Sequence, residues 1–327
     1  MLALAALATA CSDGEDFALL TSGDTPTPPA AGATAAPAVG GTWTDGAPMP
    51  TARAEVASAV VDGKIYVFGG FAADGRNLGV LEAYDPATDT WTAQQSLDVG
   101  IDHPAMAAAG GRLYVFGGYR GAERAPSDAT YEYDPATDAW AQKDPMLFER
   151  AAAAAVTVGE KVYVVGGVGA EPETALEYDP AADIWRRLAK MSRPREHLSA
   201  AAVDGRVYVI GGRWVDEGNT DRVEEYDPAS DTWRERASMP TQRGGLTAAA
   251  LDGRIHVVGG EAFGDRAITF EEHEVYEPAR DAWAVAPPLP TSRHGLASQG
   301  VGGRFYVIGG GETAGLSVSA IVEIFAP

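Results

Sequence analysis

The chain repeats itself six times. Gly-Gly pairs that follow an apolar run recur with steps of 48, 49, 45, 48 and 50 residues, at 69–70, 117–118, 166–167, 211–212, 259–260 and 309–310. A period in this range is typical of folds that set one small structural unit beside the next. The repeat therefore constrains the fold more than any other feature of the sequence.

Each unit contains the same four pieces in the same order, here called strands a to d. A run of small residues comes first, then a piece like "KIYVFGG", then one like "LEAYDP", and then a tryptophan five residues after the proline, at Trp91, Trp140, Trp185, Trp233 and Trp283. Their lengths and residue types fit strands. Turn pairs such as Asp62-Gly63 join a to b as hairpins, and Asp-Pro ends strand c. The sequence predicts an all-β, six-bladed propeller with four antiparallel strands per blade.

Ala151 to Ala155 would be read as helix in isolation, because alanine is the best helix former. Its register with the other five units favours strand a instead. Small side chains suit this strand because the innermost strands of a propeller crowd around the axis.

The two ends of the repeat region complement each other. The chain ends in Phe325-Ala326-Pro327, in register with Tyr84-Asp85-Pro86, and stops before its tryptophan. Trp43 stands alone, without the Tyr-Asp-Pro that precedes the others. We expect the N-terminal segment to supply strand d of the sixth blade and so to close the ring.

The segment before the repeats has a different composition. Residues 1–11, "MLALAALATAC", resemble the end of a bacterial lipoprotein signal with Cys11 as the lipidated residue, although no Lys or Arg precedes the apolar run. Residues 12–40 are rich in Pro, Ala, Gly and Thr and are expected to be a disordered linker. The propeller is assigned to residues 41–327. We therefore expect an exported protein of the periplasm or cell surface, attached to membrane only through an N-terminal lipid anchor.

The formal net charge of -21 disfavours nucleic acid as a partner, because such a field repels phosphate backbones. Cys11 is the single cysteine, which excludes an intrachain disulfide and thiolate metal clusters.

Taken together, the arginine before strand a, the double glycine after Tyr-Val, the Tyr-Asp-Pro and the spaced tryptophan resemble the kelch repeat. The resemblance covers residues 41–327, with departures at Ile101, His256 and Phe325-Ala326. It implies a propeller that binds protein partners, while some bacterial or secreted members act on carbohydrates. A similar six-bladed periplasmic member is the sialic acid mutarotase, N-acetylneuraminate epimerase. The copper and Tyr-Cys chemistry of the related galactose oxidase is excluded, since Cys11 lies outside the repeats.

The loops that enter strand a and leave strand b share one face, the mouth of the central channel. Five arginines lie there in register: Arg53, Arg150, Arg195, Arg243 and Arg293. Their planar guanidinium groups could bind ligand carboxylates. Alternatively, residues repeated in nearly every blade hold neighbouring blades together through carbonyls and acidic partners.

Positions that vary between blades are better candidates for a specific site. Two residues beyond the arginine stand Glu55, His103, Ala152, His197, Gly245 and Gly295, and after the double glycines come Phe71, Tyr119, Val168, Arg213-Trp214, Glu261 and Gly311-Glu312. This mixture of carboxylates, imidazoles and aromatic faces suits a sugar ring or a peptide. As a general base, Glu55 or Glu261 would need a raised pKa.

The sequence predicts no metal site and no cofactor. The histidines at 103, 197, 256, 273 and 294 show no metal-ligand spacing on a common element, and His256 is expected to be packed in strand b. The acidic segment 261–275 could bind a cation, though a solvated loop is favoured.

We therefore expect a monomeric, non-catalytic binding propeller of the cell envelope that recognises a protein or glycan at its mouth face. The alternative is a carbohydrate-active enzyme that resembles the sialic acid mutarotase.

Overall fold

The computed structural model describes residues 38–121 and 123–327. The signal-like segment, Cys11 and the linker up to residue 37 lie outside the described residues. In the described part of the chain, no helix is long and apolar enough to cross a membrane.

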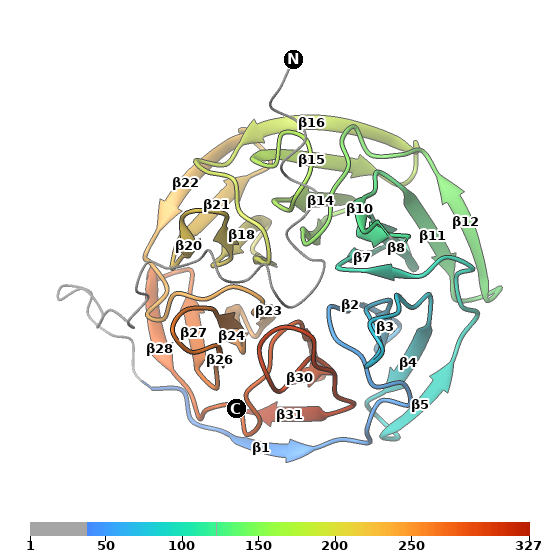
Figure 1. The fold of residues 1–327 in the computed structure, drawn as a ribbon. Coiled ribbons are helices and arrows are strands. Elements are labelled where there is room, and N and C mark those ends of the chain that lie inside the picture. Colours follow the sequence, from blue (N-terminus) through green and yellow to red (C-terminus); the bar gives the residue numbers. More distant parts are fainter. Residues whose placement is uncertain (1–37, 122) are drawn as a thin grey trace.

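Six four-stranded antiparallel sheets surround a common axis as the blades of a disc (Figure 1). From the axis outward, blade 1 consists of β2 (Ala57–Val61), β3 (Lys64–Phe68), β4 (Leu81–Asp85) and β5 (Thr90–Ala93), and blade 2 of β7 (Ala105–Ala109), β8 (Arg112–Phe116), β11 (Thr130–Asp134) and β12 (Ala139–Lys143). In the same order, blade 3 consists of β13 (Ala154–Val158), β14 (Lys161–Val165), β15 (Thr174–Asp179) and β16 (Ile184–Lys190), and blade 4 of β17 (Ser199–Val203), β18 (Arg206–Ile210), β21 (Val223–Asp227) and β22 (Thr232–Arg236). Blade 5 consists of β23 (Thr247–Leu251), β24 (Arg254–Val258), β27 (His273–Glu277) and β28 (Ala282–Val285), and blade 6 of β29 (Ala297–Val301), β30 (Arg304–Ile308), β31 (Val322–Ala326) and β1 (Thr42–Asp45). The predicted propeller is confirmed.

Short strands lie in the loops of the mouth face. They are β6 (Ile101–Asp102), β9 (Tyr119–Arg120), β10 (Ala125–Pro126), β19 (Arg213–Trp214), β20 (Gly218–Asn219), β25 (Glu261–Ala262) and β26 (Ile268–Thr269). These strands give the loops of blades 2, 4 and 5 hydrogen-bonded backbones rather than irregular ones.

The hairpins between strands a and b have the expected chemistry. Asp62 and Gly63 have φ of 50° and 74°, the pair of left-handed residues that a type I′ turn requires. The alanine-rich run before β14 forms strand and not helix, because Ala154 and Ala155 pair with Val165 and Val164. Register across the repeats therefore outweighs local propensity.

Ring closure by the N-terminal segment is confirmed. β1 lies beside β31 at the rim of the disc (Figure 1). Trp43 pairs with Phe325, and their ring centroids are 5.2 Å apart. The Trp43 indole donates to the Pro287 carbonyl of blade 5 at 2.9 Å. The other five blade tryptophans make the same bond to the preceding blade, at 2.7–3.0 Å. The sixth blade thus completes the set with a residue from the other end of the chain.

A second set of hydrogen bonds between neighbouring blades was not predicted from the sequence. The aspartate two residues before each of five tryptophans accepts a bond from its own blade's Tyr-Asp-Pro tyrosine and from a backbone N–H of the preceding blade. In blade 6 the corresponding positions hold Gly41 and Phe325. The carboxylate and the hydroxyl are therefore missing together, which explains the departure from tyrosine at Phe325.

Candidate functional site

A ring of backbone hydrogen bonds closes around the axis at the mouth. The six residues that stand two positions before strand a all have left-handed φ, between 50° and 66°, and are Glu55, His103, Ala152, His197, Gly245 and Gly295. Each N–H donates to the carbonyl of the equivalent residue in the neighbouring blade, at 2.7–3.1 Å. The backbone conformation is thus imposed by the ring, and the side chains at these positions project from one collar.

Side chains above this collar form a second closed circuit, here called the mouth circuit. It runs from Glu55 to His103, His197, Glu196, Arg213, Glu261, His294 and back to Glu55. Apart from the contact between Glu196 and His197, the contacts that join these groups are between 2.8 and 3.4 Å long. Every member except Arg213 has a side chain that is at most 14% exposed.

Supporting contacts fix the histidines. The His103 Nδ1 lies 2.7 Å from Asp102 Oδ1, which also accepts from Arg124 at 3.1 Å. The ring of Tyr119 meets His103 edge-on, with centroids 5.3 Å apart. The His197 Nδ1 contacts Glu196, and the Glu261 carboxylate accepts from the Gly315 backbone at 2.9 Å.

The electrostatics of the circuit oppose base catalysis by Glu55. Burial disfavours its ionised form, but His103 and His294 outweigh burial and lower its pKa. Burial and then Arg213 lower the pKa of His197, whereas Glu55 and Glu261 raise the pKa of His294 in spite of burial. A general base near neutral pH needs a raised carboxyl pKa, and Glu55 has the opposite shift.

Below the collar the central channel holds a cavity of about 140 Å³. Its lining includes Glu55, His103 and His197 of the collar, and the inner strands contribute mostly alanine, together with Ser58 and Met106. Pockets that enclose small-molecule ligands are usually about 300–1,000 Å³. The cavity is therefore smaller than such pockets.

The five in-register arginines are buried inside the blades. Arg195, Arg243 and Arg293 each pair with a glutamate on strand c at 2.6 Å, and Arg53 makes the same pair with Glu82. Arg150, in blade 3, bonds only to backbone carbonyls, which include Glu171 O at 2.7 Å. These contacts favour the structural role over contact with a ligand.

A glutamate accompanies the arginine in four of the five blades that have one, and in blade 3 Leu176 takes the glutamate position beside Arg150. Blade 2 has Ile101 in place of the arginine and Tyr131 in place of the glutamate, so the two charges are absent together. In addition, the second glycine of each Gly-Gly pair donates to the carbonyl at the arginine position of the next blade, at 2.8–3.0 Å. The motif therefore joins blades through its backbone and stiffens each blade through its side chain.

The structure brings five of the proposed site residues into the mouth circuit: Glu55, His103, His197, Arg213 and Glu261. Tyr119 packs against it, while Trp214 lies on β19 with a partly exposed side chain. Sequence reasoning missed Asp102, Glu196 and His294, which directly precede the varying position. Their asymmetry among the blades, where the other units have Ala54, Ala151 and Gly244, was a usable signal.

His256 packs in the core as expected. It is 2% exposed, and its Nδ1 lies 2.8 Å from Nε2 of His273. Burial lowers the pKa of His256 to about 4 and that of His273 to about 3.

The loops after strand b in blades 4, 5 and 6 form one connected ridge on the mouth face, here called the mouth ridge (residues 213–220, 261–269 and 311–317). Asn219 donates to Glu261 O at 2.8 Å, and Thr269 donates to Glu312 O at 3.1 Å. Val215, Ile268 and Leu316 lie on this ridge and are 52%, 40% and 74% exposed. They are three of the six exposed large hydrophobic residues in the part of the chain that the structure describes.

Comparisons with known proteins agree with this architecture. Residues 42–193 match the KLHDC2/KLHL20/DRC7 Kelch-repeats domain, and residues 194–240 match the Kelch motif. The solved structure of YjhT superposes with a TM-score of 0.74 at 18% identity, over 84% of this chain and 95% of that one. At this identity the likeness concerns the fold alone.

Curated relatives match over short stretches only. Kelch-like protein terF of Aspergillus terreus is 48% identical over 64 residues, which are 18% of this chain and 14% of that protein. An F-box/kelch-repeat protein of Arabidopsis thaliana is 46% identical over 55 residues, or 17% of this chain and 15% of that one. Beta-scruin of Limulus polyphemus is 38% identical over 55 residues, 17% of this chain and 6% of its own length.

Proposed function

Because the chain belongs to the kelch-repeat β-propeller family, we propose that it is a non-catalytic binding protein that recognises a protein partner through the mouth ridge. Kelch propellers commonly mediate protein binding. The observation that carries the proposal is the exposure of Val215, Ile268 and Leu316 on three loops that are hydrogen-bonded to one another. Exposed apolar patches with a polar rim mark protein interaction sites.

The chemistry of the ridge indicates what kind of partner it suits. Exposed acidic residues flank the apolar ones, at Asp216, Glu217, Asp265 and Glu312, against the single exposed cation Arg266 among the ridge residues. The net charge of the whole chain is also negative, at -21. Charge complementarity therefore favours a partner segment with apolar side chains and neighbouring lysines or arginines.

A protein fits the mouth face better than a glycan does. The charged side chains that would hydrogen-bond a sugar are engaged with one another in the mouth circuit and are mostly buried. A sugar would have to break these contacts and leave buried charges without partners, which is costly. An apolar partner segment on the ridge needs no such rearrangement.

The carbohydrate-active alternative has a direct test. Proton NMR of freshly dissolved α-sialic acid follows its anomerisation, and micromolar protein is expected to leave the rate unchanged. A marked acceleration, lost in a Glu55→Gln variant, would favour the mutarotase instead.

We also propose that the protein acts at the cell envelope as a monomer held by a lipid on Cys11. The support is the lipoprotein-like sequence of residues 1–11. Metabolic labelling with a palmitate analogue is expected to mark the wild-type chain and not a Cys11→Ala variant, and equal labelling of both would contradict the anchor.

The docking proposal is tested by capture of partners from a native envelope extract. Leu316→Asp combined with Ile268→Asp adds charge to the ridge and is expected to abolish capture of any protein that the wild type retains. Ile184→Asp is the matched control, because Ile184 is 59% exposed on β16, away from the ridge. A retained protein that binds the ridge variant as well as the wild type would refute docking there.

A further inference from the structure

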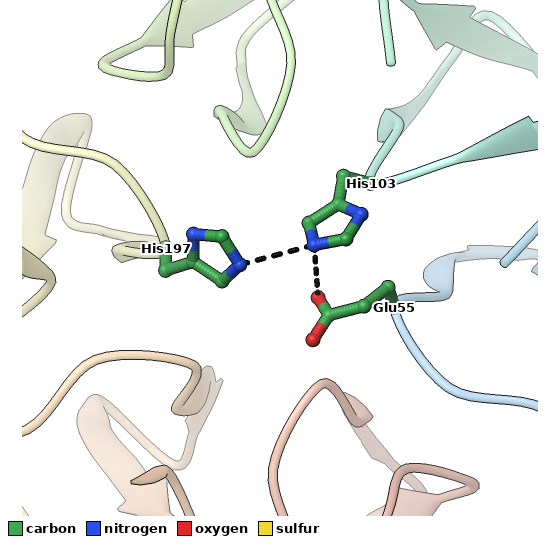
Figure 2. A group of neighbouring side chains, drawn as sticks. All are labelled: Glu55, His103 and His197. Atoms are coloured by element: carbon green, nitrogen blue, oxygen red, sulfur yellow. Dashed lines mark hydrogen bonds and ion pairs between the residues drawn. The ribbon is translucent and has the colours of Figure 1, made fainter. Parts of the chain in front are cut away.

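Three side chains of the mouth circuit meet at the axis with the atoms that metal ions bind. Glu55, His103 and His197 come from the loops that enter blades 1, 2 and 4, and they point toward one another across the channel (Figure 2). The His103 Nε2 lies 3.0 Å from the His197 Nε2 and 3.4 Å from Glu55 Oε2. All three potential ligand atoms lie within 4.8 Å of one another.

The outer nitrogens of both rings are held by carboxylates. Asp102 contacts the Nδ1 of His103 at 2.7 Å, and Glu196 contacts the Nδ1 of His197. A carboxylate on Nδ1 favours the tautomer with its proton there, which leaves the Nε2 lone pair free to bind a metal. Metal-binding histidines in proteins nearly always have such a partner on the second nitrogen.

When both rings are neutral, this orientation brings acceptors together without a donor between them. With both Nδ1 atoms protonated, the two Nε2 atoms and the Glu55 oxygen carry lone pairs only. Acceptors 3.0 and 3.4 Å apart repel unless a cation lies among them. These two separations also suit a metal, because bonds of about 2.0–2.1 Å in a tetrahedral zinc site place ligand atoms about 3.3 Å apart.

The charged side chains around the three potential ligands also favour a bound cation. Four carboxylates, of Glu55, Asp102, Glu196 and Glu261, meet only two guanidinium groups, of Arg124 and Arg213. Even when His294, which contacts Glu55 and Glu261, is counted as a third cation, one carboxylate of this largely buried cluster has no cationic counterpart. A metal cation would supply it.

The backbone at the three positions is one that glycine adopts more readily. Glu55, His103 and His197 have φ of 54°, 51° and 50°, and the equivalent residues of blades 5 and 6 are Gly245 and Gly295. Side chains at left-handed positions cost conformational energy, and such residues concentrate at functional sites. Here the three that bear ligand atoms are the ones that converge.

We propose that Glu55, His103 and His197 bind a divalent transition metal ion, Zn²⁺ foremost, at the axis of the propeller mouth. Two imidazoles and one carboxylate match the ligands of zinc sites that keep a fourth position open. The ion would join blades 1, 2 and 4 across the channel. None of the three proposed ligands belongs to the mouth ridge, although Arg213 and Glu261 lie in both the ridge and the mouth circuit.

The proposal departs from the sequence-based prediction of no metal site. That prediction relied on spacing along a single element, whereas these ligands come from three loops separated by about one and two repeats. Only the closed ring brings them together.

The test uses the purified full chain after chelation and dialysis. Calorimetric titration with Zn²⁺ alone is expected to show one site per chain with micromolar or tighter affinity, and saturation should raise Tm by about 5 to 10 °C. Titration with Co²⁺ is expected to produce the visible absorption bands of a tetrahedral site with nitrogen and oxygen ligands. A merely structural role of the three residues would produce neither signal.

Variants assign the ion to these residues. Glu55→Gln and His103→Ala are expected to weaken Zn²⁺ binding by at least about 100-fold, and Asp102→Asn by about 10 to 100-fold through its effect on His103. Glu160→Gln is the matched control, because Glu160 is exposed in the turn between β13 and β14. Circular dichroism of each metal-free variant shows whether it is folded, and Glu55→Gln, which preserves shape, serves if His103→Ala is not.

Two results would overturn the proposal. One is a folded wild type that binds neither Zn²⁺ nor Co²⁺ at 100 µM, which would mean that a proton bridges the two rings instead. The other is binding of equal affinity in Glu55→Gln and Glu160→Gln. Neither result affects capture of a partner by the mouth ridge, so the two proposals fail separately.

Discussion

Removal of one partner from a buried arginine–glutamate pair should destabilise the propeller strongly. Arg243 and Glu274 are the best pair for this test, since their side chains are 0% and 4% exposed and Nη1 lies 2.6 Å from Oε2. Glu274→Ala leaves a buried guanidinium whose hydrogen bonds, among the described residues, are those to the carbonyls of Thr241 and Val257, at 3.2 and 3.5 Å. Breaking a buried pair in this way costs about 3–5 kcal/mol of unfolding free energy.

Replacement of both partners should cost much less than the two single changes added together. Blade 2 shows a natural solution, in which Ile101 and Tyr131 occupy the two positions and are both buried. In Arg243→Ile combined with Glu274→Tyr no charge is left unpaired, so we expect a coupling free energy of about 2 kcal/mol or more.

Thermal or urea denaturation followed by circular dichroism measures these changes. For a domain of this size, about 3–5 kcal/mol corresponds to a fall in Tm of roughly 6–20 °C. Glu217→Ala is the control, because its pair with Arg193 is 50–57% exposed and is worth about 0–1 kcal/mol. If Glu274→Ala were as mild as Glu217→Ala, the structural role of the arginines would be refuted.

Three further predictions concern closure, pH and the collar. Deletion of residues 40–47 removes β1 and Trp43 and should lower Tm substantially, and an unchanged thermal transition would show that β1 does not close the ring. Burial lowers the pKa of His256 and His273 to about 4 and 3 from an unfolded value near 6.5, so the unfolded state binds more protons and stability is lost as pH falls from about 6.5 toward 4. The variant His256→Tyr with His273→Val, which restores the residues of other blades, should lose less stability in urea titrations between pH 7 and 4.5, and an identical loss would refute this origin. Gly295→Val places a β-branched residue at a φ of 59° against Glu55 and should lower Tm, whereas Ala152→Gly, at a φ of 53°, should not.

The fold could be predicted from the sequence because alignment of the six repeats shows which residues occupy equivalent positions in the blades. Strand lengths, the Asp-Gly hairpins and the unpaired Trp43 were each local signals, and six copies turned them into one consistent arrangement. The isolated Trp43 even predicted a pairing across 282 residues, with Phe325.

The candidate site could be predicted from the sequence only in part. The varying positions Glu55, His103 and His197 were predicted because asymmetry among repeats is visible in a sequence. The contacts among them were not, since these depend on how far six loops converge at the axis and on which side chains the collar turns inward. Asp102, Glu196 and His294 were overlooked for the same reason, because each acts through a neighbour and forms no motif of its own.

Site-specific photo-crosslinking tests most directly whether the mouth ridge is the docking surface. A photoreactive amino acid is placed at position 316, 74% exposed on the ridge, or at position 184, 59% exposed on β16, and the protein is irradiated in native envelope extract. The ridge proposal predicts adducts with a discrete partner at 316 and none at 184. Adducts at 184 with none at 316 would contradict it.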